Sequence, residues 1–198
     1  MEEAKPETWR LFVALEAPIE VKQRLAALQQ ELRQRLRKAA VRWTPVEQMH
    51  LTLRFLGAVE FNRLETLKHS LNAVAAAHAP VEVWAEGLGV FPAASSPRVI
   101  WAGLKEAKGD LAKLWTAMQP ATNAWAEKSA ESSFVPHLTL GRIKWISGRE
   151  TAALADCLER FAGATFGAWS VASFCLMRSE LSPHGARHAC CAVFPLAI

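Results

Sequence analysis

The sequence predicts an α+β fold of two similar lobes, in which antiparallel sheets line a central cleft and helices pack on the outside. Two observations support this prediction. The tetrapeptide His-Leu-Thr-Leu occurs twice, at residues 50–53 and 137–140, and the order strand, helix, motif strand, helix occurs twice along the chain. Because no long linker or low-complexity stretch separates the copies, we expect residues 1–198 to form a single domain of two pseudo-symmetric lobes, with one motif in each.

The first half of the chain shows this element order clearly. Short apolar segments predict strands at 10–15 and 49–57, the second of which contains the first motif and ends at Gly57. Leucines at spacings of three and four predict a helix that begins near Pro18 and a second helix near 60–77. Each helix therefore has one apolar stripe with which to cover a sheet.

The second half predicts similar elements, with two more strands at its end. Glycines within residues 81–91 permit a bulge in that strand. Pro120 should kink or end the helix that begins near residue 110. The predicted strands are 81–91, 98–104, 134–143, 170–179 and 188–196, and a further helix is predicted near 148–162.

The two motifs place the same side chains on the same face of their strands. Side chains alternate across a strand, so His50 and Thr52 share one face, as do His137 and Thr139. The leucines between them share the other face and can pack onto helices. If the two strands lie across a cleft, two imidazoles and two hydroxyls converge there.

This set of side chains suits hydrolysis of a phosphate ester. A threonine hydroxyl can donate to a non-bridging phosphate oxygen. One imidazole can take a proton from attacking water while the other gives a proton to the departing oxygen, since the ordinary pKa of histidine, ~6.5, suits both roles. The reaction requires no metal and no cofactor.

The alternative is a purely structural role for the motif histidines. A single His-Leu-Thr-Leu is most simply a half-buried strand, whose histidine is more often structural than catalytic. Two copies at matching places in two similar halves favour the catalytic interpretation.

The chain resembles the two-histidine phosphoesterase superfamily, whose mark is one His-x-Thr/Ser-x motif in each lobe. Within it, the sequence is similar to the RNA 2',3'-cyclic phosphodiesterase family, first described as 2'-5' RNA ligases. The resemblance runs along nearly the whole chain. It rests on RLFVALEAP, HLTLRFLG, GLGVFPAASSPRVIWAGL, FVPHLTLGR and FCLMRSELSPHGARH, which occur in the family's order.

The resemblance implies a metal-independent hydrolase that opens a terminal 2',3'-cyclic phosphate on RNA, or on a small cyclic nucleotide, to a 2'-phosphate. It implies that His50 and His137 are catalytic, and it favours His137 as the base and His50 as the acid, although the symmetry of the motifs leaves these roles open. The residues implied to bind substrate are Thr52, Thr139, Arg142 and, by alternation with His50, Arg54.

Two alternatives stay open at this point. The same site could run in reverse as a 2'-5' RNA ligase, because ring opening by an alcohol needs similar groups. The chain could also be a non-catalytic nucleotide- or RNA-binding module of the same fold, although both histidines and both threonines are intact.

One segment departs from the family pattern. The closing segment of the family often carries a tyrosine, whereas this chain has none and offers His188 near that place. His188 and the other three histidines outside the motifs, His69, His78 and His184, are predicted to be surface residues.

The overall composition limits the expected partners, the location and the role of the cysteines. A net charge of +4 favours anionic partners. The acidic, polar start and the lack of a long apolar run predict a cytoplasmic protein without a membrane partner. The four cysteines form no CxxC pair, so we predict small buried side chains and no zinc site. The oligomeric state is left open.

Overall fold

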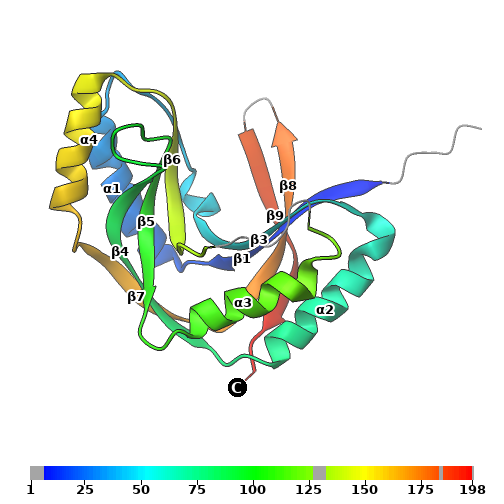
Figure 1. Cartoon of the computed structure of the whole chain (residues 1–198). Coiled ribbons are helices and arrows are strands. Elements are labelled where there is room, and N and C mark those ends of the chain that lie inside the picture. Colours follow the sequence, from blue (N-terminus) through cyan, green and yellow to red (C-terminus); the bar gives the residue numbers. More distant parts are fainter. Residues whose placement is uncertain (1–6, 127–132, 183–184, 198) are drawn as a thin grey trace, which may run out of the picture.

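The computed structural model describes residues 7–126, 133–182 and 185–197. Two antiparallel sheets with helices on their outer faces form the fold (Figure 1), which confirms the predicted α+β class with two lobes. Within the described residues, no helix is long and apolar enough to cross a membrane.

The first sheet has four strands in the order β3-β1-β8-β9, and each strand is antiparallel to its neighbours. Helix α3 packs on β3, while α2 packs against α3 and β9. The bounds are β1 Thr8–Glu16, β3 His50–Glu60, β8 Ser173–Ser182, β9 Gly185–Pro195, α2 Leu64–Ala76 and α3 Asp110–Thr122.

The second sheet has five strands in the order β2-β6-β5-β4-β7, again antiparallel throughout. Helices α1 and α4 contact one another and cover its outer face, as Figure 1 shows. The bounds are β2 Ala40–Trp43, β4 Val81–Phe91, β5 Val99–Glu106, β6 His137–Trp145, β7 Thr165–Val171, α1 Ile19–Arg35 and α4 Gly148–Arg160, with short 3-10 turns at Val46–Gln48 and Phe61–Arg63.

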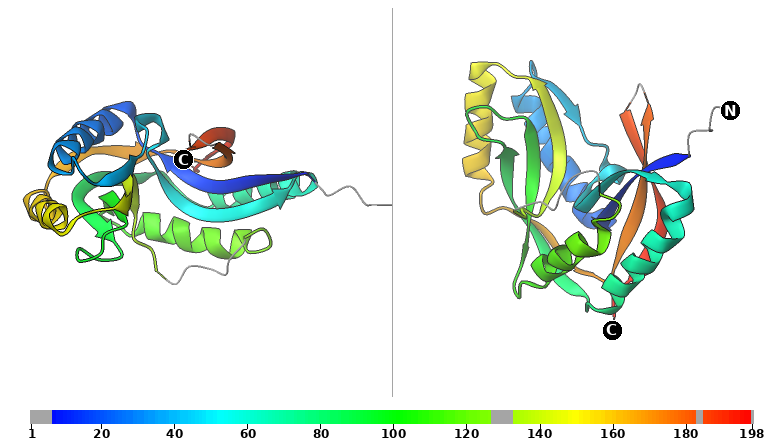
Figure 2. Two further views of the ribbon diagram at one scale, coloured as in Figure 1. Left: turned by 90° about the horizontal axis from the view of Figure 1, so that it is seen from above. Right: turned by 45° about the vertical axis from the view of Figure 1, so that its right-hand side comes forward.

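The two halves of the chain exchange helices between the sheets. Helix α1 follows β1 of the first sheet but packs against β7 of the second, and α3 follows β5 of the second sheet but packs against β3 of the first. Figure 2 shows both helices on the lobe opposite the strand that precedes them. Each sheet is therefore completed by segments from both halves, which ties the lobes together.

The predicted apolar stripes form the core. In α1 the buried leucines include Leu25 and Leu32, and α2 and α3 bury equivalent stripes that contain Leu67 and Leu114. These side chains join the inner leucines of both motif strands in one continuous apolar cluster. Burial of this kind supplies most of the driving force for folding.

Several boundaries differ from the predictions. Gly57 does not end the motif strand: it adopts φ 75°, a value that glycine tolerates, and β3 continues to Glu60. Helix α3 runs through Pro120 to Thr122. Pro120 and Thr116 lie on the exposed side of the last turns, where water can satisfy the carbonyl that loses its N–H partner.

Two strands were missed. No strand was predicted at β2, and the strand predicted at 170–179 includes only the last residues of β7. Both are edge strands of the second sheet, so their pairing partners are distant in sequence and leave little local signal. The bulge predicted in β4 is confirmed, with Gly87 at φ 81°.

The cysteines also differ in part from the prediction. All four are free thiols. Cys157 and Cys175 are buried as predicted, but Cys190 is exposed and Cys191 is only partly buried, because both lie on β9 at the open edge of the first sheet.

Candidate active site

Each His-Leu-Thr-Leu segment carries a β-bulge at its fourth residue. In β3 the register passes from Thr52, opposite Ala14, directly to Arg54, opposite Val13, so Leu53 has no partner. In β6 it passes from Thr139 to Gly141, so Leu140 has no partner. The two motif strands therefore share an irregularity as well as a sequence, and each bulge reverses the alternation of the residues that follow it.

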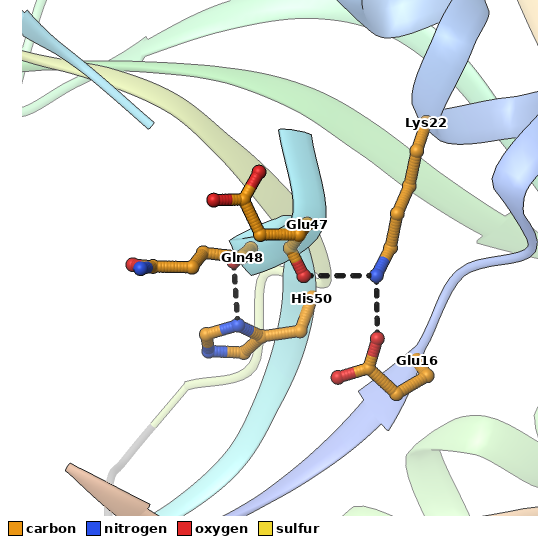
Figure 3. Close-up of polar contacts among 5 residues, drawn as sticks. All are labelled: Glu16, Lys22, Glu47, Gln48 and His50. Carbon is orange, nitrogen blue, oxygen red and sulfur yellow. Dashed lines mark hydrogen bonds and ion pairs between the residues drawn. The ribbon is translucent and has the colours of Figure 1, made fainter. Parts of the chain in front are cut away.

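His50 is fixed at the first residue of β3. Its Nδ1 lies 2.8 Å from the carbonyl oxygen of Gln48, as Figure 3 shows. Phe12 of β1 stacks on the imidazole, with ring centroids 4.9 Å apart and planes at 29°. Thr52 lies two residues further along on the same face, and both side chains are half-buried.

His137 is held in the same way at the first residue of β6. Its Nδ1 lies 2.7 Å from the carbonyl oxygen of Val135. The ring of Phe91 meets the imidazole edge-on at 5.0 Å, and Trp101 lies 6.0 Å away between centroids. Thr139 shares the half-buried face of His137.

These two hydrogen bonds define the chemistry of each imidazole. A backbone carbonyl only accepts, so Nδ1 must carry the proton that it donates. In the neutral ring Nε2 is then unprotonated and is the nitrogen available for proton transfer. Both histidines are thereby prepared to exchange a proton through Nε2.

The structure brings the two motif histidines into electrostatic contact. Strands β3 and β6 approach one another although they belong to different sheets. A positive charge on His137 is one of the causes that lower the pKa of His50. The two imidazoles are therefore close enough for the charge of His137 to affect the pKa of His50.

The pKa of His50 is lowered from its ordinary 6.5 to about 4. Burial is the main cause, since it disfavours the charged ring, and the Gln48 carbonyl opposes it. Charges on His188, Lys22 and His137 lower the pKa further. His50 is therefore neutral near pH 7.

Lys22 is itself an unusual neighbour, because its side chain is only 8% exposed. It donates to the Glu16 carboxylate at 2.5 Å and to the Glu47 carbonyl at 3.2 Å (Figure 3). These contacts satisfy the buried ammonium and connect α1 to the start of the first motif. Lys22 thus holds a fixed positive charge close to His50.

His188 is not the surface residue that was predicted. Its ring meets His50 edge-on at 5.2 Å and Phe12 at 4.9 Å, and burial lowers its pKa. The prediction failed because β9 pairs with β8 at the edge of the first sheet and thereby brings His188 against Phe12 and His50. The only sequence signal was its place near the family's tyrosine. His184 lies outside the described residues.

His50 and His188 open onto a pocket of about 380 Å³. Among the described residues, its lining consists of Glu16, Glu47, Gln48, His50, Met177, Arg187 and His188. No group of three or more His, Cys, Asp or Glu side chains in the described ranges is arranged to hold a metal ion.

Simple alternation predicted that Arg54 lies on the same face as His50, but in the structure it does not. The bulge at Leu53 turns it to the opposite face, where it is 3% exposed. Its guanidinium donates to the Gln119 amide oxygen at 2.6 Å and to the Asn123 amide oxygen at 3.2 Å. Arg54 therefore connects the first motif strand to α3, and contact with substrate at this residue stays a prediction.

The bulge at Leu140 moves Arg142 in the opposite direction, from the predicted core face to the exposed face. Alternation alone would place it with Leu138 and Leu140 in the core, yet it is exposed. Beyond the bulge it pairs with Val99, two residues from Trp101 on the face that carries His137. Arg142 therefore lies on the face of the second motif, as the resemblance implied.

The two-lobed fold and the paired motifs, each with its histidine held through Nδ1, define the class as a two-histidine phosphoesterase. The profile of the family described as LigT like Phosphoesterase matches residues 15–101 and 105–188. The chain belongs to this family.

Curated relatives and solved structures agree with that assignment. The chain is similar to the RNA 2',3'-cyclic phosphodiesterase of Archaeoglobus fulgidus, with 31% identity over 89% of this chain and 94% of the relative. It is also similar to that of Thermus thermophilus, with 33% identity over 89% and 84%.

Two crystal structures share the fold. One, from Thermus thermophilus, has a TM-score of 0.77 at 29% identity and covers 94% of this chain and 97% of its own. The other, Escherichia coli LigT complexed with 3'-AMP, has a TM-score of 0.74 at 20% identity and covers 96% and 99%.

Proposed function

We propose that the protein hydrolyses the terminal 2',3'-cyclic phosphate of RNA to a 2'-phosphate, with His50 and His137 as the acid and base pair. The observation that carries this proposal is the matched geometry of the two histidines, each donating through Nδ1 to the carbonyl two residues before it. The relatives named RNA 2',3'-cyclic phosphodiesterase support the choice of substrate.

The reaction opens the ring in one displacement. Water attacks phosphorus as one imidazole accepts its proton at Nε2, so that a P–O bond to the water oxygen forms. The bond between phosphorus and O3' breaks, and the second imidazole gives its proton to O3'. The products are a 2'-phosphate monoester and a free 3'-hydroxyl. Proton exchange with solvent then restores the starting protonation states.

The electrostatics favour His50 as the base, which reverses the roles implied by the resemblance. Its pKa of about 4 leaves Nε2 unprotonated at neutral pH and ready to accept the proton of water. His137 then supplies the proton to O3'. Burial of His50 beneath Phe12 and beside His188 keeps its imidazole neutral.

The threonines of the motifs orient the phosphate. Thr52 and Thr139 lie two residues after the histidines on the same faces. Their hydroxyls can donate to the two non-bridging oxygens, which carry the negative charge that grows as water attacks. Each lobe would thus contribute one imidazole and one hydroxyl.

Incubation with a 2',3'-cyclic nucleotide tests the proposal directly. We expect phosphorus NMR to show a 2'-monoester as the product, and the rate to persist in EDTA. His50→Ala and His137→Ala should abolish most of the activity, whereas His69→Ala on α2 serves as the matched control. A 3'-monoester as product, or an unchanged cyclic phosphate, would contradict the proposed reaction.

Loss of activity in EDTA with recovery on added metal would contradict the proton-transfer roles. Ligase activity is tested separately from hydrolysis by supplying an RNA with a free 5'-hydroxyl and looking for a 2'-5' linkage in the product. A protein that binds the cyclic nucleotide without turning it over would be a binding module.

A further inference from the structure

Helix α1 buries two polar side chains on one of its sides. Lys22 and Gln29 are separated by about two helical turns, so they point in the same direction and lie ~10 Å apart along the helix axis. Both are buried, and Gln29 is only 4% exposed. Buried polar groups are stable only with hydrogen-bond partners, so the partners of these two residues show what the helix holds in place.

Gln29 binds two backbone carbonyls that are far apart in the sequence. Its Nε2 donates to the Leu140 oxygen at 2.7 Å and to the Thr44 oxygen at 2.9 Å. The Thr44 N–H donates to the same Leu140 oxygen at 2.9 Å. The amide nitrogen of glutamine carries two hydrogens, and these two bonds use both of them. Gln29 therefore joins α1, the residue that follows β2, and β6 at one buried point.

Leu140 is the bulged residue of the second motif strand. It has no partner on β5, and its carbonyl accepts from both Thr44 and Gln29. His137 and Thr139 lie immediately before it on the same strand. A bulge sets the direction and twist of its strand, so the contacts of Leu140 determine where the His137 imidazole and the Thr139 hydroxyl stand.

The same helix also contacts the backbone beside the first motif. Lys22 donates to the Glu47 carbonyl at 3.2 Å (Figure 3). Glu47 directly precedes Gln48, whose carbonyl accepts from Nδ1 of His50. Helix α1 thus holds the chain near both histidines, through Lys22 at the first motif and Gln29 at the second. Because a helix of this length is stiff over two turns, the two contacts fix the spacing between the motifs.

We propose that Gln29 is a positioning residue, which holds the bulge of the second motif so that His137 and His50 are correctly spaced to act on one phosphate. Gln29 acts through the backbone of Leu140 and not through contact with the reacting atoms. Lys22 gives the helix its second point of attachment. This inference rests on the proposed function for the reaction that the two histidines perform.

Two substitutions of Gln29 test this role. Gln29→Met keeps a similar volume but donates no hydrogen bond, and Gln29→Glu keeps the shape but lacks the NH₂ group. We expect Gln29→Met to lower kcat for a 2',3'-cyclic mononucleotide about hundredfold, as expected when reacting groups are displaced by about 1 Å. Most of the loss should appear in kcat and not in KM, since the displaced groups act in the transition state. Gln29→Glu should also lower kcat. An unchanged kcat in either variant would overturn the proposal.

Val21→Ala is the matched control for loss of stability. Val21 is buried on the same helix, but it packs against Gly167 of β7, at the opposite edge of the second sheet from β2. We expect this variant to unfold at lower urea concentration and to keep the kcat of the parent. An equal loss of kcat in Val21→Ala would mean that any destabilisation of α1 slows the reaction, and Gln29 would have no positioning role.

A second variant in the same chain shows whether Gln29 acts through the second motif. In a His137→Ala background, Gln29→Met should lower the residual kcat by no more than about threefold, because residues that act on one group have effects that do not multiply. A further loss of about hundredfold in that background would show that Gln29 acts elsewhere, and it would overturn the proposal.

Amide hydrogen exchange distinguishes failure of this inference from failure of the proposed function, because it requires no turnover. The Thr44 N–H should exchange about tenfold faster in Gln29→Met, since opening this point breaks one hydrogen bond fewer. Faster exchange of Thr44 without any hydrolysis by the parent protein would retain Gln29 as the residue that holds the bulge and reject the reaction. Hydrolysis by the parent, with Thr44 exchange and kcat both unchanged in Gln29→Met, would reject this inference alone.

Discussion

His188 of β9 lies edge-on against His50 of β3, with ring centroids 5.2 Å apart and planes at 72°. The contact joins residues that are far apart in sequence and sit on different strands of the first sheet. After burial and the Gln48 carbonyl, His188 is the largest influence on the pKa of His50, which it lowers. His188 therefore helps to keep the proposed base neutral.

Removal of His188 should raise the pKa of His50 by two separable routes. His188→Ala admits water to the pocket and removes a neighbouring charge, so the pKa should move back toward 6.5. His188→Phe removes the charge but preserves burial, so it should produce a smaller rise. NMR titration of the His50 ring proton measures both, and a pKa unchanged in the two variants would show that the contact has no electrostatic effect.

The pH profile of kcat/KM should report the role of His50. If His50 is the base, activity on a cyclic mononucleotide should fall only as the pH drops toward about 4, where its ring becomes protonated in the free enzyme. The same profile of His50→Gln should lack this acid limb, and an acid limb well above pH 4 in the parent would contradict a neutral His50 as the base.

Single substitutions of the motif histidines should each be costly. Proton transfer by a positioned side chain contributes ~10²–10⁴-fold, so His50→Ala and His137→Ala should each reduce kcat by about that factor. The double variant should lose less than the product of the two, because both groups act in one step. Steady-state rates of the four proteins provide the comparison.

A substrate with a good leaving group at the 3' position assigns the acid, because such a group departs without protonation. It should restore activity to His137→Ala and leave His50→Ala impaired. Rescue of His50→Ala alone would exchange the roles, and rescue of neither would mean that the two residues are not an acid and base pair.

Folding stability should fall on acidification through the range set by His50. The folded state binds this proton with a pKa of about 4 and the unfolded state with one near 6.5. The unfolded state therefore takes up more protons between these values, so stability rises with pH across the interval and is lost as the pH falls through it. Urea denaturation of His50→Gln should show a weaker decline than the parent, with His69→Gln as the control.

Arg54 should contribute mainly to stability. Its replacement by alanine leaves the Gln119 amide, which is 6% exposed, without a charged donor, and a loss of about 1–3 kcal/mol is expected. Denaturant unfolding measures this loss. If Arg54→Ala folds as stably as the parent and instead raises KM for RNA, the residue contacts substrate and our structural interpretation is wrong.

The local pattern of the sequence was enough to predict the elements that carry the site. The leucine stripes of α1, α2 and α3 follow from helical spacing, and the repeated motif sets His50 with Thr52 and His137 with Thr139 before any bulge intervenes. These features depend on neighbours within a few residues. Such local neighbours can be identified from the sequence alone.

Tertiary structure decided the rest. The bulges at Leu53 and Leu140 direct Arg54 into the core and Arg142 to the face of His137, and they exist only because each strand has a partner with a different residue count. The low pKa of His50 depends mainly on burial, to which Phe12 and His188 contribute from other strands. Strand register and desolvation are properties of distant segments brought together, so a linear pattern could predict the two histidines but not the lowered pKa of His50.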